Sequence, residues 1–171
     1  MLLEEVTEFI GKSEETVIME VEKGAIKRFA DAIDDPNPLY WDDEYARSSR
    51  FGSIIAPPGF FGWPATSRAK TQWFFGWPAK WEAEGRHFSR LAEELKVILT
   101  EAGYTRNMVA ELDYEFFSPV RAGDILSAAK TIKDVYERQG KTGKLVFVVL
   151  ETTYTNQNGD LVAKERHIGV F

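Results

Sequence analysis

The chain has 171 residues, 44% of them hydrophobic, no cysteine and a formal net charge of −6 at pH 7. This length suits one domain, residues 1–171, with a substantial core. The lack of cysteine excludes disulfides and thiolate metal sites, no metal site of another kind is predicted, and an acidic chain is a poor partner for nucleic-acid phosphates. The acidic start does not resemble a signal peptide and no apolar run has membrane-spanning length, so we expect a cytoplasmic protein.

The first part of the chain predicts a strand and a short helix. Residues 16–21 alternate loosely between apolar and polar side chains, as strands do. Residues 23–33 place apolar side chains at spacings of three and four, which is typical of one face of a helix. Pro36 and Pro38 then bias the residues before them towards extended conformations. The helix should therefore end by about Asp34.

The loop after this helix reads Asp34-Asp-Pro-Asn-Pro-Leu-Tyr40, so its polar groups lie on a segment that two prolines stiffen. Rigid loops with placed polar groups are where binding and catalysis concentrate. The same residues also suit a turn that ends a helix, in which Asp and Asn make local caps. On residue types alone both interpretations stand, and the turn is the more common of the two.

The middle of the chain is rich in aromatic residues. The paired prolines of Ile54-Ile-Ala-Pro-Pro-Gly59 stop any preceding element, and proline suits the first turn of a helix, so a long apolar helix is predicted to start near Pro58. Residues 62–104 contain most of the tryptophans and are interrupted by two further prolines. Within them, residues 88–102 have the pattern of an amphipathic helix followed by glycine. The aromatic residues suit packing in the core or at a dimer interface.

The second half of the chain changes to the period of two residues that strands show. Strands are predicted over residues 109–117, 125–136, 144–155 and 161–171. In the first of them, the even-numbered residues from Ala110 to Phe116 are apolar and alternate with acidic residues, which is typical of a half-buried antiparallel strand. The third is apolar on both faces and should lie centrally in the sheet. Asn156-Gln-Asn-Gly159 has the composition of a hairpin turn.

Three separated segments resemble one known family. Asp34–Tyr40 is similar to the hydratase motif of MaoC-like enzymes, roughly Gly-Asp-x-Asn-Pro-(Ile/Leu)-His. Tyr114-Glu-Phe-Phe-Ser-Pro-Val-Arg-Ala-Gly-Asp124 is similar to the family's strand ending in Phe-x-x-Pro-Val-x-x-Gly-Asp. Ile55-Ala-Pro-Pro58 is similar to the start of the family's central helix in an Ala-Pro-Pro branch. The resemblance is to the MaoC-like (R)-specific enoyl-thioester hydratase/dehydratase family. It is weakest over about 62–104, a variable helical insertion.

The resemblance implies a fold, an assembly and a reaction. The fold is α+β, a hot-dog fold in which an antiparallel sheet wraps around a central helix. Such domains form dimers, with the acyl-thioester site between the two halves. The reaction adds water to the double bond beside the thioester carbonyl of a 2-enoyl group, or removes it from a 3-hydroxyacyl group. No cofactor is implied, because coenzyme A or acyl carrier protein carries the acyl group as a thioester.

The resemblance also implies roles for five residues. Asp35 stands at the position of the family's catalytic Asp and Tyr40 at that of its catalytic His, so these two are the candidate catalytic residues. Gly59, with Pro58 beside it, stands at the start of the central helix, where backbone N–H groups would bind the thioester oxygen as enolate charge develops. Asn37 is a candidate substrate contact, and as a residue beside proline it also suits bracing the loop.

Tyr40 departs from the family pattern. A phenol has a pKa of roughly 10, against roughly 6.5 for an imidazole, so it is a poor base at neutral pH but can donate a hydrogen bond. Losing a general acid–base partner typically costs on the order of a hundred- to ten-thousand-fold in rate. The only histidines are His87 and His167. Both are interpreted as structural, and His167 as a strand residue at the surface or at a dimer edge.

Three functional hypotheses follow from this departure. In the first, the chain is the substrate-binding partner subunit of a heteromeric hydratase, paired with a second MaoC-like chain that keeps the Asp and the His. In the second, it is an active homodimeric 2-enoyl-CoA hydratase that uses Asp35 with an atypical acid. In the third, it is a non-enzymatic acyl-CoA-binding protein. The sequence ranks them in this order and leaves the acyl group and its carrier open.

Overall fold

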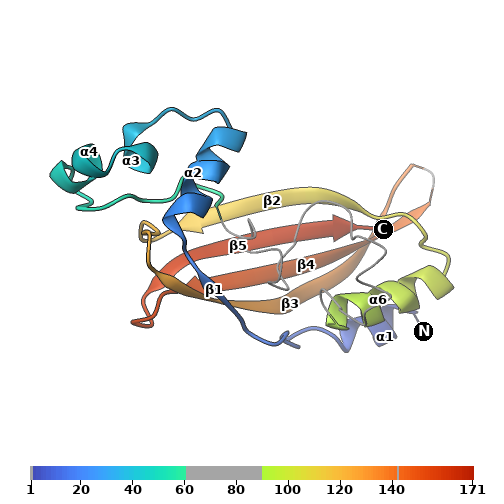
Figure 1. Cartoon of the computed structure of the whole chain (residues 1–171). Coiled ribbons are helices and arrows are strands. Elements are labelled where there is room, and N and C mark those ends of the chain that lie inside the picture. Colours follow the sequence, from blue (N-terminus) through green and yellow to red (C-terminus); the bar gives the residue numbers. More distant parts are fainter. Residues whose placement is uncertain (1, 61–89, 142) are drawn as a thin grey trace, which may run out of the picture.

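The computed structural model describes residues 2–60, 90–141 and 143–171, and these contain one five-stranded antiparallel sheet (Figure 1). The strands are β1 (Val17–Glu20), β2 (Met108–Phe116), β3 (Ile125–Gln139), β4 (Lys144–Thr155) and β5 (Leu161–Val170). Their order in the sheet is β1-β3-β4-β5-β2, and each neighbouring pair is antiparallel. The predicted strands are thus confirmed, and β4, whose two apolar faces predicted a central place, is the middle strand.

Tight turns precede β3 and β5, and the second of them is the hairpin turn predicted from residues 156–159. Before β3, Gly123 has φ +93°, which glycine adopts without strain, and the Arg121 N–H donates to Asp124 Oδ2 at 2.7 Å. Between β4 and β5, Asn156 Oδ1 accepts from two backbone N–H groups of the turn at 2.9 and 3.0 Å. Asp and Asn side chains commonly close turns in this way. These turns help to set which residues of neighbouring strands lie opposite one another.

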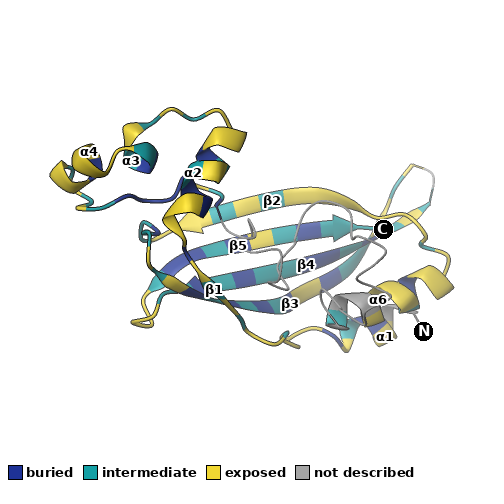
Figure 2. Ribbon diagram, in the orientation of Figure 1, coloured by how far each residue is buried: buried dark blue, intermediate teal, exposed yellow. Residues whose placement is uncertain are grey.

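Strand β2 lies at one edge of the sheet and is more exposed than its alternating sequence predicts (Figure 2). Leu112 and Tyr114 are half-buried, but Ala110 and Phe116 are exposed. The prediction of a half-buried face is therefore wrong for these two positions. The physical reason is the place of the strand, because within the described part of the chain β2 pairs with β5 alone.

The helices gather at the two ends of the sheet (Figure 1). At one end lie α2 (Lys23–Ala32), α3 (Pro38–Trp41) and α4 (Asp43–Ser48), and at the other lie α1 (Leu2–Thr7) and α6 (Arg90–Glu101). Helix α2 ends before Asp34, as the prolines predict, and α6 confirms the amphipathic helix predicted over residues 88–102. The short α1 is not predicted by the sequence analysis. No helix in the described ranges is long and apolar enough to cross a membrane.

The helix predicted to start near Pro58 has not begun by Phe60, because residues 58–59 form a turn and Gly59 has a φ of +83°. Its continuation and most of the aromatic region fall on residues 61–89, which lie outside the described residues. Just before them the chain makes a turn, in which the Phe60 N–H donates to Pro57 O at 3.2 Å. The single domain and the dimer therefore stay predictions at this point, and the fold rests on the sheet and its flanking helices.

The core of the described residues consists of two apolar clusters. The first, here called the motif-end cluster, joins α2, α3 and residues 54–60 to the sheet; its buried members are Val21, Ala25, Ile26, Ala30, Tyr40, Ala46, Ile54, Ile55, Ala56, Phe60, Val120, Leu126, Ala128, Tyr154, Val162 and Ala163. The second, the helical-end cluster, joins α1 and α6 to the sheet; its buried members are Val6, Phe9, Leu95, Leu99, Ile132, Val135, Val146 and Val148. The two clusters meet different stretches of β3 and β4, which leaves the middle of these strands between them.

Candidate functional site

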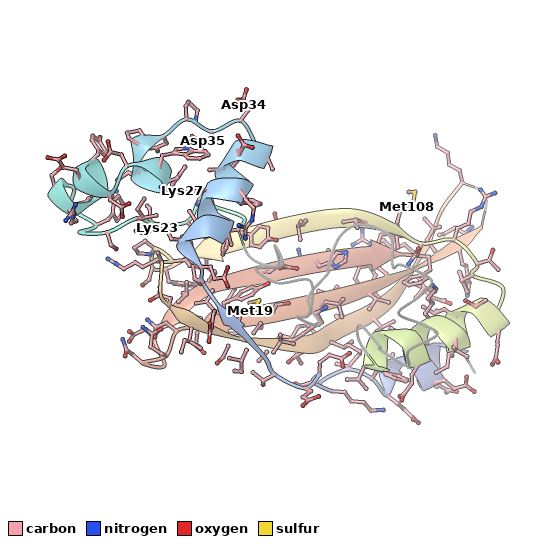
Figure 3. All side chains as sticks on the ribbon, in the orientation of Figure 1. Met19, Lys23, Lys27, Asp34, Asp35 and Met108 are labelled. Atoms are coloured by element: carbon pink, nitrogen blue, oxygen red, sulfur yellow. The ribbon has the colours of Figure 1, made fainter. Side chains whose placement is uncertain are left out.

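The predicted motif forms a sharp bend between α2 and α3. Asp34 stands where the family motif has glycine, and its φ of +53° lies in the left-handed region that Asp tolerates better than most residues. The Asp35 N–H then donates to Ala30 O at 2.9 Å and closes the end of α2. Figure 3 shows Asp34 and Asp35 at this end of α2, away from the sheet. The bend thus holds Asp35 on the outer side of the helical layer.

Asn37 braces the bend through both its backbone and its side chain. Its N–H donates to Asp35 Oδ1 at 3.0 Å, and its own Oδ1 accepts from the Leu39 N–H at 3.1 Å, which caps α3. Pro38 follows at the first helical position, where a missing N–H costs little. The bracing role predicted for Asn37 is therefore confirmed, and its role as a substrate contact stays a prediction.

Trp41 is a positioning residue that the sequence analysis missed. Its indole N–H donates to Asp35 O at 2.9 Å, and the side chain is half-buried. A buried indole N–H usually needs an acceptor, so a tryptophan directly after the motif was the available signal. With Ala30 and Asn37, Trp41 fixes the backbone and one carboxylate oxygen of Asp35.

Tyr40 lies in the motif-end cluster, with 6% of its surface exposed. Burial and the charge of Asp35 raise the pKa of its phenol above the ordinary value, and the side chain of Asn37 offsets part of this rise. The phenol therefore keeps its proton at neutral pH. Beside Asp35 it can act as a hydrogen-bond donor or a weak acid, but not as a base.

The segment that carries Gly59 is tied to the motif helices by two contacts. The Ile55 N–H donates to Leu39 O at 3.3 Å. The Phe60 ring stands edge-on to the Phe29 ring of α2, with centroids 5.7 Å apart and planes at 89°. Gly59 has φ +83°, and a Cβ placed there would meet no other atom within 4 Å. Glycine is thus required by the backbone conformation, and the space beside it is open.

An open hollow next to the motif is lined by Ala30, Asp31, Asp34, Asp35, Pro36 and Trp41. It includes Asp35 but not Asn37, Tyr40, Pro58 or Gly59. Tyr40 is buried in the core and Pro58 is exposed. The motif resemblance implies that Asp35, Asn37, Tyr40 and Gly59 gather around one tunnel mouth, and this arrangement stays a prediction. In the described ranges, acidic and histidine side chains form no group that could hold a metal ion.

A family model decides the relationship of this chain to known proteins. The model of the FAS1-like dehydratase domain region matches residues 8–165. The chain belongs to this family. The sequence resemblance to MaoC-like hot-dog dehydratases is confirmed at this level, while the assignment to an Ala-Pro-Pro branch stays a prediction.

One relative of this FAS1-like dehydratase chain and two solved structures extend the comparison. The probable enoyl-CoA hydratase alpha subunit of Thermomonospora curvata is 29% identical over 143 residues, which cover 82% of this chain but only 41% of the relative. The ChsH1–ChsH2 complex from Mycobacterium tuberculosis gives a TM-score of 0.75 at 17% identity, covering 99% of this chain and 88% of that chain. The truncated HadBC complex from the same organism, a 3R-hydroxyacyl-ACP dehydratase, gives 0.63 at 20% identity, covering 95% and 97%. These structures establish the hot-dog fold.

The chain carries a second group of polar side chains, on the buried face of its sheet. Lys130 on β3 lies directly opposite Thr152 on β4. Glu165 on β5 lies directly opposite Thr152 on one side and Tyr114 of β2 on the other. Side chains of directly opposed residues share one face of a sheet. These four residues therefore form a line across the sheet, here called the polar row.

Glu165 of the polar row accepts hydrogen bonds from two phenols. The Tyr154 hydroxyl donates to Glu165 Oε2 at 2.8 Å, and Tyr114 also hydrogen-bonds this carboxylate. Burial and the charge of Glu165 raise the pKa of both phenols, so they stay protonated donors. Burial lowers the pKa of Lys130 to about 7, although the negative charges of Glu165 and Glu14 act to raise it. Lys130 is thus the member whose charge changes near neutral pH.

His167 is not where the sequence analysis placed it. Strand β5 lies between β4 and β2, so His167 is not at an edge, and its Nε2 atom is buried with no hydrogen-bond partner among the described residues. It is two residues from Glu165 along β5 and so lies on the face of the polar row. Burial and the charge of Lys130 lower its pKa, which keeps the imidazole neutral at pH 7. His87 lies outside the described residues.

Proposed function

We propose that this chain is the substrate-binding subunit of a heteromeric MaoC-like hydratase that acts on 2-enoyl and 3-hydroxyacyl thioesters. A second MaoC-like chain, which keeps both motif residues, supplies the catalytic acid and base. The observation that carries the proposal is the state of Tyr40. It occupies the histidine position, is buried, and has a raised pKa. A phenol in this state does not accept a proton from water at neutral pH.

The comparisons and the exposed strand β2 support an assembly of unlike chains. The Thermomonospora relative is named an alpha subunit, and the two solved structures are the ChsH1–ChsH2 and HadBC complexes. On this chain, Met108, Val109 and Phe116 of β2 are 70%, 49% and 48% exposed. An edge strand with apolar side chains is a template for pairing with another chain. We therefore propose that the second chain pairs along β2.

In this assembly, the chain described here binds the thioester and the second chain moves the protons. Water adds to the β carbon of the enoyl group as the base takes its proton, and the acid returns a proton to the α carbon. Negative charge develops on the thioester oxygen, and the backbone N–H of Gly59 is the proposed donor to it. Asp35, fixed by Asn37 and Trp41, orients the polar end of the substrate. Coenzyme A or acyl carrier protein is the proposed carrier, and no cofactor is required.

An active homodimer is the second candidate, and the closeness of Tyr40 to Asp35 favours it. The charge of Asp35 contributes to the raised pKa of Tyr40, so the two side chains interact. A carboxylate beside a protonated phenol offers a base and a weak acid within one chain. In this candidate Asp35 takes the proton from water and Tyr40 donates one.

Hydration of 2-enoyl-CoA thioesters by the purified chain separates the two candidates. We expect the wild-type chain to be slow, and Tyr40→His to raise the rate on the order of a hundredfold because it restores an imidazole. Asp35→Ala in that variant should abolish the gain. Tyr45→His, at an exposed tyrosine of α4, is the matched control and should change nothing.

The opposite result would reject the subunit proposal. A wild-type chain that is already fast and that Tyr40→His slows makes Tyr40 a working acid, as the homodimer requires. A chain that binds acyl-CoA but gains no activity from Tyr40→His or from a copurified MaoC-like chain is a non-enzymatic acyl-CoA-binding protein.

A further inference from the structure

We propose that the polar row and His167 together recognise a neutral oxygen group, a hydroxyl or a carbonyl, on the acyl part of the bound thioester. The recognised group lies away from the reacting double bond, over the middle of the sheet. The inference rests on the proposed function, since it concerns the acyl thioester that the chain is proposed to bind. It assigns a preference among acyl groups to residues outside the hydratase motif.

The polar row interrupts a face of the sheet that is otherwise apolar. Along β4, Val148 belongs to the helical-end cluster and Tyr154 to the motif-end cluster, with Thr152 between them. Along β3, Lys130 stands in the same way between the two clusters. Replacing buried charged groups by apolar residues of similar volume often leaves a protein equally stable or more stable. Stability alone therefore does not account for a charged line at this depth.

His167 supplies the atom that lacks a partner. Its Nε2 is buried without a hydrogen bond in the described part of the chain. The residues directly opposite it are Leu150 on β4 and Leu112 on β2, so its neighbours in register offer no polar atom. Buried polar atoms in native proteins nearly always have a partner, and an exception calls for a ligand or water. An acyl chain that carries an oxygen atom to this point would provide one.

The charges around the site select a neutral group. Glu165 accepts hydrogen bonds from Tyr154 and Tyr114, so its acceptor oxygens already have donors within the protein. Glu165 and Glu14 both act electrostatically on Lys130, so two acidic side chains lie near this one lysine. A carboxylate on the acyl chain would meet net negative charge, whereas a hydroxyl or carbonyl brings none. A neutral imidazole can donate to a carbonyl or accept from a hydroxyl, depending on its tautomer.

The polar row lies next to the motif-end cluster. Tyr154 lies in one cluster with Tyr40 and Phe60, the residue after Gly59. From Tyr154 to Leu150, which is level with His167, β4 rises roughly 13 Å. An acyl chain that enters beside Gly59 and follows β4 therefore reaches His167 only if it is of medium or greater length. The oxygen group is expected near the far end of such a chain.

Equilibrium dialysis of the purified chain with coenzyme A thioesters tests the site. The ligands are octanoyl-, decanoyl- and dodecanoyl-CoA, and for each the isomers hydroxylated at the last or the penultimate carbon. We expect at least one hydroxylated ligand to bind on the order of tenfold more tightly than its parent, which is the scale of one well-made hydrogen bond. His167→Leu should remove this preference and keep the affinity for the parent, because leucine suits the line of Leu112 and Leu150.

Two further measurements secure the interpretation. Thr153→Val, on the opposite face of β4, is the matched control and should keep the preference, and thermal unfolding confirms that both variants fold. The imidazole nitrogen NMR signals of His167, assigned by their loss in His167→Leu, should move with the hydroxylated ligand and not with its parent. If the wild-type chain binds parents and hydroxylated ligands equally, this inference is overturned and the proposed function stands. If it binds no thioester at all, both fail.

Discussion

The motif bend and the polar row hold their polar groups by opposite means. The hydrogen bonds around Asp35 join residues that are two to six apart in the chain, and Asp34 beside it is exposed. In the polar row, Glu165 of β5 accepts a hydrogen bond from Tyr154 of another strand, β4, and the charged groups of the row are buried. The bend is a local structure at the surface, whereas the row exists only when the whole sheet has formed.

This difference indicates which measurement reports on each region. A local bend is stabilised by its own turn and cap, so a substitution there should change function with a small loss of stability. A buried charged group depends on partners from other strands, so its substitution should first lower the free energy of unfolding. Matched substitutions in the two regions therefore test whether the bend is local and the polar row depends on the whole sheet.

Glu165→Gln should have the largest effect on stability. Glutamine keeps the shape and an acceptor for the two phenols but removes the charge that offsets Lys130. At pH 6, where Lys130 carries its proton, the free energy of unfolding in urea should fall by about 3 kcal/mol. Adding Lys130→Met should restore most of the loss. Glu111→Gln, which breaks an exposed ion pair with Arg166, is the control and should cost less than about 0.5 kcal/mol. Equal losses in the two single variants would contradict a buried, charge-dependent row.

The pH dependence of stability should follow from the same row. Lys130 has a pKa of about 7 in the folded chain and 10.5 in the unfolded chain, so between these values the unfolded chain binds more protons. The free energy of unfolding should therefore rise from about pH 7 towards pH 10, by about 1 kcal/mol per pH unit. Above this range Tyr114 and Tyr154, whose pKa values are raised by folding, ionise first in the unfolded chain, and stability falls again. Urea titrations at several pH values should show the rise in the wild type and not in Lys130→Met.

The two regions also differ in how far the sequence could predict them. The bend was predictable because its residues are consecutive and two prolines restrict them. The polar row was not, because its members come from four strands and only the register brings them together. That register includes a shift between Ile132 and Asp134 in β3, which residue periodicity does not reveal. The exposed ends of β2 were mispredicted for a related reason, since alternation alone does not indicate whether a strand lies at an edge.

Asn37→Ala should affect the bend moderately and the sheet hardly at all. It removes the cap of α3 and should cost about 1 kcal/mol. The Oδ1 atom of Asp42 accepts from the N–H groups of Glu44 and Tyr45 and so caps α4. Asp42→Ala removes this cap and should cost a similar amount. Only Asn37→Ala should also weaken binding of decanoyl-CoA, because the Asn37 side chain accepts from the Leu39 N–H and so braces the bend that carries Asp35. If both variants weaken binding equally, general loosening of the helical layer is responsible and Asp35 has no special place in the site.

Substitutions at Asp34 test the backbone conformation of the bend itself. The φ of +53° is strained for a β-branched residue, so Asp34→Val should lower the free energy of unfolding by about 1–2 kcal/mol more than Asp31→Val at an exposed position of α2. Asp34→Gly relieves the backbone strain of the folded chain but raises the conformational entropy of the unfolded chain. Its net effect on the free energy of unfolding should therefore lie within about 0.5 kcal/mol of zero. Urea unfolding measures all three variants. Equal losses in Asp34→Val and Asp31→Val would mean that the left-handed conformation of Asp34 does not set the direction of Asp35. The contacts of Asn37 and Trp41 alone would then hold Asp35 in place.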